Sequence, residues 1–294
     1  MNWRKILKGR VLAGEPLKKH TSFKIGGPAR FFIEPAGIDD LRLLLVWAKR
    51  YKIAASVIGS GTNILAGDKG LKRTVLHLNA RCFKTISRQG NRLICGSSVG
   101  LAQVVSFACE HGLGGLEFLA GIPGTLGGAL AGNAGAWGRD IGSRVKEVTV
   151  MDYSGSIKTL ERKEIKSAYR SSGLAKYVIL EAVLSLRPSG LLRMRKKISA
   201  YLAARRNSQD YSLPSAGCVF KNPPGERAAG LLIDLCGLKG ASVGGAQVSL
   251  RHANFIVNTG SASAANVLAL MRIAQRKVKE KFGVELKPEI KIWQ

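Results

Sequence analysis

The chain has 294 residues, of which 46% are apolar and 22% charged, and this favours two or three folded domains over intrinsic disorder. It has no apolar run of membrane-spanning length, and its basic N-terminus lacks the apolar segment of a signal peptide. We therefore expect a cytoplasmic protein without membrane insertion. The 46 Lys and Arg residues outnumber the 19 acidic residues, which gives a net charge of +27.

This positive charge is spread along the whole chain. Its densest group falls on one predicted helix and is most simply a solvated face. The group consists of Arg193, Arg195, Lys196, Lys197, Arg205 and Arg206. No recognised nucleic-acid motif accompanies it and aromatic residues are sparse, so we expect no specific nucleic-acid partner. Attraction of small polyanionic ligands is an equally good use of the charge.

The five cysteines are scattered and include no CxxC pair, which argues against a disulfide framework and a structural zinc site. We expect no metal site. Cys82, Cys95, Cys109 and Cys236 lie in apolar contexts and are predicted to be small core residues. Cys218 lies in a different context, between a glycine and an apolar pair.

The predicted elements, taken in chain order, mix helices with strands. Asp39 and Asp40 near the start of the first helix, with Lys49 and Arg50 near its end, suit the helix dipole. Helices are expected at 38–51, 101–112, 191–206, 228–236 and 262–283, strands at 53–59, 145–152, 157–160 and 177–187, and a helical turn at 161–165. The break at 188–190 predicts a domain boundary.

Residues 112–142 hold eleven glycines interleaved with apolar side chains, so this segment can bury area as a disordered linker cannot. Glycine lets the chain turn at positive φ and lets backbone N–H groups approach a ligand closely. A folded segment whose backbone N–H groups are not shielded by side chains would bind anionic oxygens, especially those of a diphosphate. The alternative is a tight, glycine-rich packing corner.

The turn GSGTN at 59–63 follows a predicted buried strand and is a second candidate for holding anionic oxygens. Ile64 occupies the place of the third Rossmann glycine, which argues against a Rossmann helix. A looser loop would use Ser60, Thr62 and Asn63 as hydrogen-bonding groups, and a plain turn is the alternative. Two glycine-rich cradles without a Walker A lysine fit a bound dinucleotide better than a transferable triphosphate.

Four other residues carry possible chemistry, each with a plainer interpretation. Arg170 in YRSS can hold a carboxylate by two parallel hydrogen bonds, although a surface salt bridge is the usual role of a single arginine. Cys218 can instead be a buried structural cysteine beside a turn. His252, before a predicted strand, can be structural or exposed. Glu289, after a proline and before a predicted strand, is either a surface residue or one directed into a site.

Seven segments together resemble the UDP-N-acetylenolpyruvoylglucosamine reductase family, flavoenzymes that complete UDP-N-acetylmuramate in bacterial peptidoglycan synthesis. They occur in family order, cover nearly the whole chain, and several are long and specific. The segments are KHTSFKIGGPARFF (19–32), VIGSGTNIL (57–65), GLEFLAGIPGTLGGALAGNAGAWG (115–138), YRSS (169–172), GCVFKNPPG (217–225), LKGASVGGAQVS (238–249) and KFGVELKPEI (281–290).

The resemblance implies an α+β fold with a vanillyl-alcohol-oxidase (PCMH) type FAD-binding domain of two α/β subdomains, residues 1–80 and 81–188. A C-terminal α+β substrate-binding domain, residues 189–294, would follow. The short connection between YRSS and the strand at 177 resembles the shorter form of the family. FAD would bind non-covalently between the subdomains, and NADPH would be the co-substrate.

The same resemblance places the FAD diphosphate against the 59–64 turn and the 121–135 loop. The implied cofactor-binding residues are Gly59, Ser60, Gly61, Thr62, Asn63, Ile64, Gly121, Ile122, Pro123, Gly124, Thr125, Gly127, Gly128, Asn133 and Gly135.

The implied activity is that of a UDP-N-acetylmuramate dehydrogenase acting on UDP-N-acetylglucosamine-enolpyruvate. Flavin N5 would deliver hydride to the vinyl carbon, and Cys218 would then protonate the adjacent carbon. Arg170 and Glu289 would orient the carboxylate and stabilise the developing enolate charge. Glu289 can help only when protonated or ion-paired, since a bare carboxylate would repel an enolate.

Cys218 stands where many family members have serine as the proton donor. A thiol has a reference pKa of ~8.5, so it is mostly protonated at neutral pH and far more acidic than an alcohol. It should therefore quench a carbanion at least as readily as serine. A partly exposed thiolate is also open to oxidation.

Four residues are weaker inferences from the resemblance. Lys221 and Asn222 would bind the diphosphate or sugar of the UDP-sugar substrate, and Tyr169 and His252 would line the substrate channel. The oligomeric state is not set by the sequence, and we expect a monomer. Two alternatives remain at this stage: another flavin oxidoreductase of the same superfamily, or a basic protein that binds nucleic acid or a membrane surface.

Overall fold

The computed structural model describes residues 7–225 and 227–294, which form two compact units. The first unit runs up to Ala13 and includes Phe31–Gly59 and Arg73–Ala204. The second comprises Gly14–Arg30, Ser60–Lys72 and Arg205–Gln294. The chain therefore passes from one unit to the other within three strands, β1 (Arg10–Pro16), β2 (Pro28–Glu34) and β5 (Leu71–His77).

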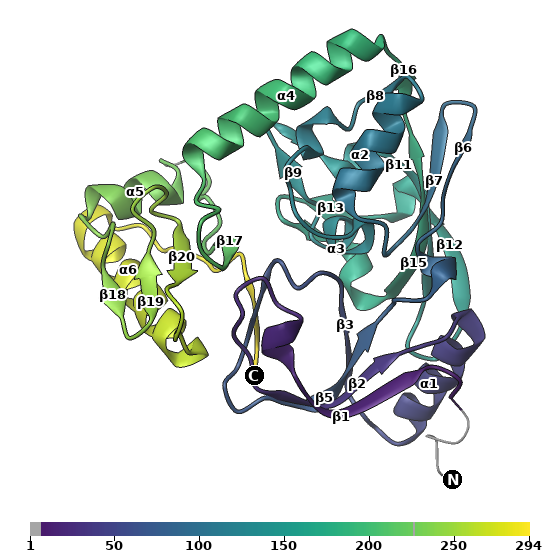
Figure 1. Cartoon of the computed structure of the whole chain (residues 1–294), viewed down its shortest axis with the longest axis horizontal. Helices are drawn as coiled ribbons and strands as arrows, with labels where there is room; N and C mark the ends of the chain where they lie inside the picture. Colours follow the sequence, from purple (N-terminus) through teal and green to yellow (C-terminus); the bar gives the residue numbers. More distant parts are fainter. Residues whose placement is uncertain (1–6, 226) are drawn as a thin grey trace. The chain divides into compact units, whose positions relative to one another are not determined.

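The first unit is built around a five-stranded sheet of order β12-β11-β15-β7-β6, in which every neighbouring pair is antiparallel. Its strands are β6 (Ile86–Gln89), β7 (Arg92–Gly96), β11 (Val145–Met151), β12 (Ile157–Glu161) and β15 (Val178–Ser185). Helices α2 (Leu101–Glu110) and α3 (Leu126–Ala131) share a buried apolar cluster with β7, β11 and β15, and Figure 1 shows both helices beside this sheet.

A second apolar cluster of this unit lies under helix α1 (Ile38–Arg50). Leu41, Leu44 and Leu45 of α1 pack there with residues of β2, β5 and β15. The associated sheet has the order β1-β2-β5-β3, with β3 (Ala55–Ile58) parallel to β5. Strand β15 supplies Val178 and Leu180 to this cluster and other residues to the first, which explains its nearly continuous apolar sequence.

The second unit has its own core under a four-stranded antiparallel sheet of order β17-β20-β19-β18. Its strands are β17 (Ser215–Cys218), β18 (Ser242–Val243), β19 (Ala246–Val248) and β20 (Phe255–Asn258), and its helices are α5 (Ala229–Leu235) and α6 (Ala264–Phe282). Helix α6 begins at a capping box of Ser263 and Asn266 and ends at Gly283, whose φ of 71° suits glycine. Asp68 accepts two further amides of its first turn.

The remaining elements are short, apart from helix α4 (Leu191–Ser208). The short strands are β4 (Ile64–Ala66), β8 (Leu113–Gly114), β9 (Gly135–Ala136), β10 (Arg139–Asp140), β13 (Ser167–Ala168), β14 (Ser171–Ser172), β16 (Arg187–Pro188) and β21 (Lys291–Trp293). The 3-10 turns are Leu17–Lys19, Arg81–Phe83, Glu117–Leu119, Ile141–Arg144, Arg162–Glu164 and Gly173–Lys176.

The helices and strands expected from the sequence are confirmed, with ends that differ by a few residues. The mixture of sheets and helices agrees with the expected α+β class. The prediction that Cys82 is a core residue is wrong, because Cys82 is exposed in a 3-10 turn whose neighbour Phe83 takes the buried position. Cys95 and Cys109 are buried, and Cys236 is half-buried against the core of the second unit.

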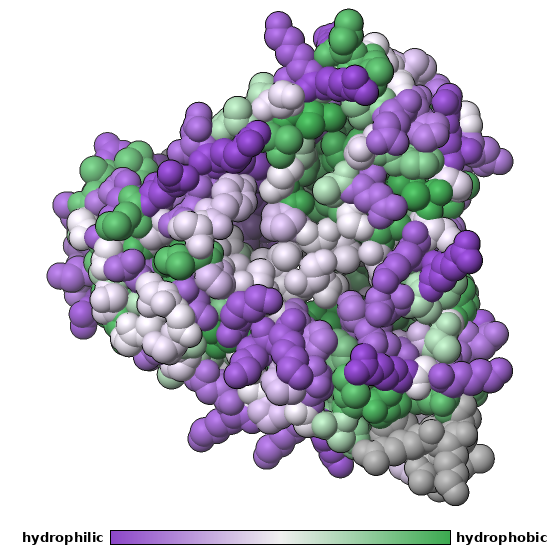
Figure 2. Space-filling model, in the orientation of Figure 1, coloured by the Kyte–Doolittle hydropathy of each residue, from purple (hydrophilic) through white to green (hydrophobic). Residues whose placement is uncertain are grey.

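The predicted basic helix is α4, and Figure 2 shows hydrophilic side chains along it. Arg193, Arg195, Lys196 and Arg206 are exposed, as a solvated face requires, but Arg205 is buried. No helix in the described part of the chain is both long enough and apolar enough to cross a membrane.

Candidate active site

The glycine-rich loop (residues 121–142) has the backbone geometry that its composition predicts. Gly121 and Gly124 adopt positive φ values of 75° and 125°, which favour glycine. Thr125 then caps α3, since its side chain accepts the amide of Gly128 at 3.3 Å. Gly59, at the end of β3, lies against this cap, because a Cβ on Gly59 would come within 2.5 Å of Thr125 Oγ1. The structure thus brings the predicted residues Gly59 and Thr125 together.

The amides of this loop are less available than the sequence suggested. The amides of Ile122, Gly127 and Gly128 donate to Leu119 O, Ser97 O and Thr125 Oγ1, respectively. The Leu126 amide donates to the Val99 carbonyl at 2.9 Å. The first turn of α3 is therefore held by the protein itself, and a bound anion would have to use other donors of the loop.

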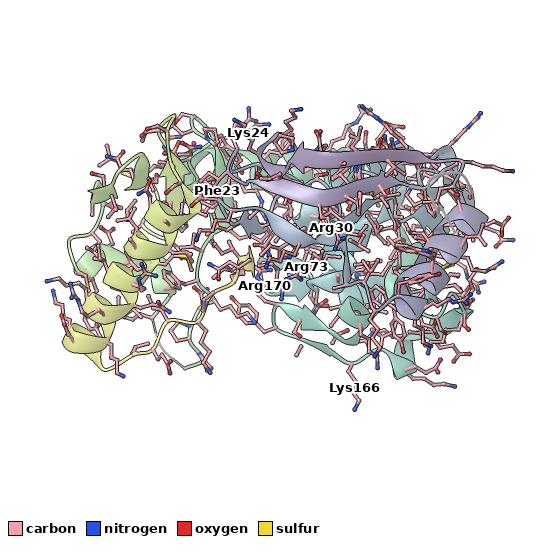
Figure 3. The ribbon with its side chains drawn as sticks, turned by 90° about the horizontal axis from the view of Figure 1, so that it is seen from below. Phe23, Lys24, Arg30, Arg73, Lys166 and Arg170 are labelled. Carbon is pink, nitrogen blue, oxygen red and sulfur yellow. The ribbon has the colours of Figure 1, made fainter. Side chains whose placement is uncertain are left out.

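Arg170 is fixed against the glycine-rich loop by an unusual backbone. Its φ is 53°, and its Nη1 donates to the carbonyl of Gly135 at 2.7 Å. Gly135 has no room for a side chain, since a Cβ there would lie 2.4 Å from the carbonyl oxygen of Arg139. The Nε of Arg170 is buried, and in Figure 3 Lys166 extends away from the protein whereas Arg170 lies among other side chains.

Asn133, within the glycine-rich loop, also connects this loop to the segment that carries Arg170. It is buried with a φ of 45°, its Nδ2 donates to the Ala168 carbonyl at 3.0 Å, and its Oδ1 accepts the Gly142 amide at 3.0 Å. Positive φ in non-glycine residues is strained and often marks functional positions. The structure therefore collects Asn133, Gly135 and Arg170, which were all expected site residues, into one cluster, in which Asn133 and Arg170 have positive φ.

Two aromatic residues lie at the exposed side of this cluster. Tyr169, predicted as a substrate contact, is 55% exposed and has the guanidinium of Arg170 5.4 Å from its ring centre. Trp137, which the sequence reasoning did not select, is also exposed, has a φ of 57°, and stacks on Tyr201 of α4 at 5.3 Å. The sequence feature that could have pointed to Trp137 is a large aromatic residue surrounded by glycines.

In the second unit the 60–64 turn is tied to the C-terminal segment. Gly61 has a φ of 61°, and a Cβ there would meet the His20 carbonyl oxygen at 2.0 Å, so glycine is required. The Asn63 carbonyl accepts the Lys291 amide, and Asn63 Nδ2 donates to the Glu289 carbonyl at 3.4 Å. Ile64 opens β4, which pairs in parallel with β21.

Cys218 stands at the last position of β17, after an irregular step in the ladder. Ser215 lies opposite Val257 and Cys218 opposite Phe255, so β17 holds one more residue than β20 over this stretch, and Gly217 has a φ of 75°. Such bulges redirect a side chain at the end of a strand. Cys218 is half-buried there.

Residues 219–221, which directly follow Cys218, pair with residues 287–289, and we call this pairing the Cys218 ladder. Glu289 N donates to the Val219 carbonyl at 2.8 Å, and Lys221 N donates to the Lys287 carbonyl at 2.9 Å. Phe220 and Pro288 form the bridge between these bonds. The ladder places the two expected catalytic residues of this unit, Cys218 and Glu289, on directly bonded segments.

The two other expected substrate residues near the ladder have structural bonds. Asn222 Oδ1 accepts the amide of Ala229 at the start of α5, so part of this side chain holds that helix. His252 Nδ1 accepts the amide of Asn254 at 3.2 Å, and burial, with a smaller effect of Lys239, lowers the pKa of His252 below its ordinary value. Burial therefore favours the neutral form of His252.

Comparisons with known proteins agree along the whole chain. Residues 29–161 match the family described as FAD binding domain, and residues 209–293 match UDP-N-acetylenolpyruvoylglucosamine reductase, C-terminal domain. The chain is 42% identical over 292 residues to the UDP-N-acetylenolpyruvoylglucosamine reductase of Caldanaerobacter subterraneus subsp. tengcongensis, covering 98% of this chain and 96% of the relative.

Two further comparisons point the same way. The chain is 41% identical over 284 residues to the Listeria monocytogenes UDP-N-acetylenolpyruvoylglucosamine reductase, with 96% and 94% of the two chains covered. The crystal structure of UDP-N-acetylenolpyruvylglucosamine reductase from Thermus caldophilus superposes with a TM-score of 0.83 at 32% identity, covering 98% of this chain and 100% of that one.

Proposed function

Because the chain belongs to the UDP-N-acetylenolpyruvoylglucosamine reductase family, we propose that it makes UDP-N-acetylmuramate for peptidoglycan synthesis. The reaction is the NADPH-dependent, FAD-mediated reduction of the enolpyruvyl group of UDP-N-acetylglucosamine-enolpyruvate. The observation that carries the proposal is the 42% identity across 98% of the chain. We also propose a cytoplasmic location, because NADPH and nucleotide sugars are cytoplasmic pools.

The donors of this chain fit a dinucleotide diphosphate. Gly121 and Gly124 have the positive φ that lets backbone amides face an anion, and Ser60, Thr62 and Asn63 bring side-chain hydroxyl and amide groups. FAD, when bound, supplies the hydride, which it takes from NADPH. We propose that the 59–64 turn and the 121–135 loop hold its diphosphate, with backbone amides other than those of Ile122, Leu126, Gly127 and Gly128.

Arg170 is proposed to bind the substrate carboxylate. Its guanidinium can form two parallel hydrogen bonds with a carboxylate, and its bond to Gly135 fixes where the guanidinium lies. When the vinyl carbon gains hydride, negative charge develops on the carboxylate and the adjacent carbon. A fixed cation stabilises that charge more than the neutral double bond, which accelerates the step.

Cys218 is proposed to donate the proton that completes the reduction. The thiol S–H bond breaks, the proton passes to the carbon next to the carboxylate, and the resulting thiolate is reprotonated from solvent. Glu289, on the segment bonded to Val219, is proposed to assist as the protonated acid or through an ion pair. The substrate thereby gains one hydride and one proton.

One experiment tests this function directly. The purified protein should be yellow, lose its visible flavin absorption when NADPH is added without oxygen, and regain it when the enolpyruvyl substrate follows. In D₂O the product should carry solvent deuterium at the carbon next to the carboxylate, the position that Cys218 is proposed to protonate. Protein that folds but cannot be loaded with FAD would contradict the proposal. Reduction by NADPH without reoxidation by this substrate would point to another flavin oxidoreductase.

A further inference from the structure

Strand β17, labelled in Figure 1, ends at Cys218. The backbone that follows is still hydrogen-bonded on both sides. On one side, residues 287–289 form the Cys218 ladder. On the other, β20 begins only at Phe255, opposite Cys218, so the strand itself offers no further regular pairing. Asn254, the residue before β20, takes over this role.

Asn254 binds the segment after Cys218 through three hydrogen bonds. Its backbone carbonyl accepts the amide of Val219 at 2.8 Å. Its side-chain Oδ1 accepts the amide of Phe220 at 2.9 Å, while its Nδ2 donates to the carbonyl of Phe220 at 2.9 Å. One carboxamide therefore satisfies both backbone groups of Phe220, as a neighbouring strand would.

Asn254 is itself fixed and buried. It is only 2% exposed, so it cannot touch a substrate. Its amide donates to His252 Nδ1, and the hydroxyl of Ser249 accepts the amides of Arg251 and His252 at 3.1 Å and 3.3 Å. The Ser249 hydroxyl in turn donates to Asp210 Oδ2 at 2.8 Å. The 249–254 segment is thus a rigid support.

We propose that Asn254 is a positioning residue, whose carboxamide holds Phe220 in register with Pro288 and so fixes Cys218 relative to Glu289. This inference rests on the proposed function. The carboxamide bonds both backbone groups of Phe220, which lies two residues after Cys218. Phe220 also forms the bridge with Pro288, the residue before Glu289, so loss of the carboxamide would loosen both segments. A misplacement of about 1 Å can slow a reaction about 100-fold.

The chain offers a matched control in Asn258, at the other end of the same strand. Asn258 is also buried, and its side chain makes three hydrogen bonds to backbone where that of Asn254 makes two. It donates to Phe23 O and accepts the amides of Gly260 and Ala262. Its partners lie away from the Cys218 ladder. Asn254→Ala and Asn258→Ala therefore remove similar structural bonds, but only the first affects the segment beside Cys218.

The test measures the two half-reactions of the FAD-loaded enzyme by rapid mixing. We expect Asn254→Ala to reduce its flavin with NADPH within about twofold of wild type, but to react with the enolpyruvyl substrate about 10–100-fold more slowly at saturation. Asn258→Ala should leave both rates within about twofold of wild type. Equal slowing of both half-reactions, or an unslowed substrate step in Asn254→Ala, would overturn the proposal.

Asn254→Asp adds a second measurement, the pH dependence of the substrate step, which a general structural role of Asn254 would not change. This variant can also be used if the alanine variant fails to fold. When protonated, the introduced carboxyl group can donate to the Phe220 carbonyl and accept its amide, whereas the carboxylate can only accept. The substrate step of this variant should therefore recover as the pH falls, relative to wild type and to Asn258→Asp. His252 and Cys218, the neighbouring titratable groups, are unchanged in all three proteins. Identical pH profiles would count against the proposal.

Backbone amide exchange separates this inference from the proposed function. Exchange in 219–221 and 287–289 should be faster in Asn254→Ala than in Asn258→Ala, whether or not the enzyme turns over. Wild-type protein that does not react with the enolpyruvyl substrate would overturn the function alone. Unchanged exchange in these segments would overturn the positioning role alone.

Discussion

The glycine-rich loop and the Cys218 ladder place expected catalytic residues by opposite means. At the loop, Asn133 and Arg170, which is bonded to Gly135, have positive φ values, and side-chain bonds to carbonyls and amides keep these conformations in place. In the ladder, Cys218 and Glu289 lie on extended segments joined by backbone bonds. The first arrangement depends on individual side chains and on the absence of a Cβ at Gly135, and the second depends on register.

The largest effect is expected at the end of the Cys218 ladder. Cys218→Ala removes the proposed proton donor, so the substrate step should slow by roughly 10²–10⁴-fold while reduction by NADPH stays normal. Cys218→Ser keeps a hydroxyl donor and should retain substantial turnover. Rapid-mixing measurements of flavin reoxidation check both variants. A wild-type rate of reoxidation in Cys218→Ala would remove the thiol from the mechanism.

A smaller loss is expected from Arg170, which is bonded to the glycine-rich loop. Arg170→Lys keeps the positive charge but loses the planar donor that bonds Gly135 and can bind a carboxylate in two places. We expect kcat/KM for the substrate to fall by about 10–100-fold, as for loss of one or two charged hydrogen bonds. Arg139→Lys, an exposed arginine on the same loop, is the control and should change little. Equal effects of the two changes would argue against a specific role for Arg170.

The sequence could predict the helices, strands and motifs of both regions, but not the contacts between residues that are distant in sequence. Helical periodicity and charge at the helix ends were sufficient for α1, and the run of apolar residues was sufficient for β15. The two site segments were recognised because their residues are contiguous motifs. Cys82 was misjudged because apolar neighbours do not show which residue of a 3-10 turn is buried.

Hydrogen-bond partners distant in sequence were beyond the reach of such patterns. Nothing near Leu126 or Gly127 indicates that their amides are used by Val99 and Ser97. The bonds of Asn254 to Phe220 join residues 34 positions apart, and they depend on where β17 stops. Asn254 itself looked like an ordinary polar residue before a strand.

The burial of His252, which is bonded to Asn254, should make the folding stability depend on pH. Burial lowers the pKa of His252 in the folded protein below its ordinary 6.5, so the unfolded chain binds more protons as the pH falls through that value. Folding stability should therefore decrease as the pH falls from above the ordinary histidine pKa to below it. His252→Asn, whose Oδ1 can accept the Asn254 amide without titrating, should show a smaller decrease in urea unfolding. An unchanged pH dependence would mean that His252 is not buried as described.

The smallest effect is expected beneath the glycine-rich loop, at Ser97. Its carbonyl accepts the Gly127 amide, but its buried hydroxyl has no hydrogen-bond partner within residues 7–225 and 227–294. A buried polar group without a partner costs stability, so Ser97→Ala should leave the free energy of unfolding unchanged or raise it by up to about 1 kcal/mol. Ser172→Ala is the control, because the Ser172 hydroxyl bonds the Leu130 and Ala131 carbonyls and its loss should destabilise. Urea unfolding of the FAD-free proteins compares the two. Clear destabilisation by Ser97→Ala would show that this hydroxyl is bonded in the folded protein and that the loop is held by more than its backbone.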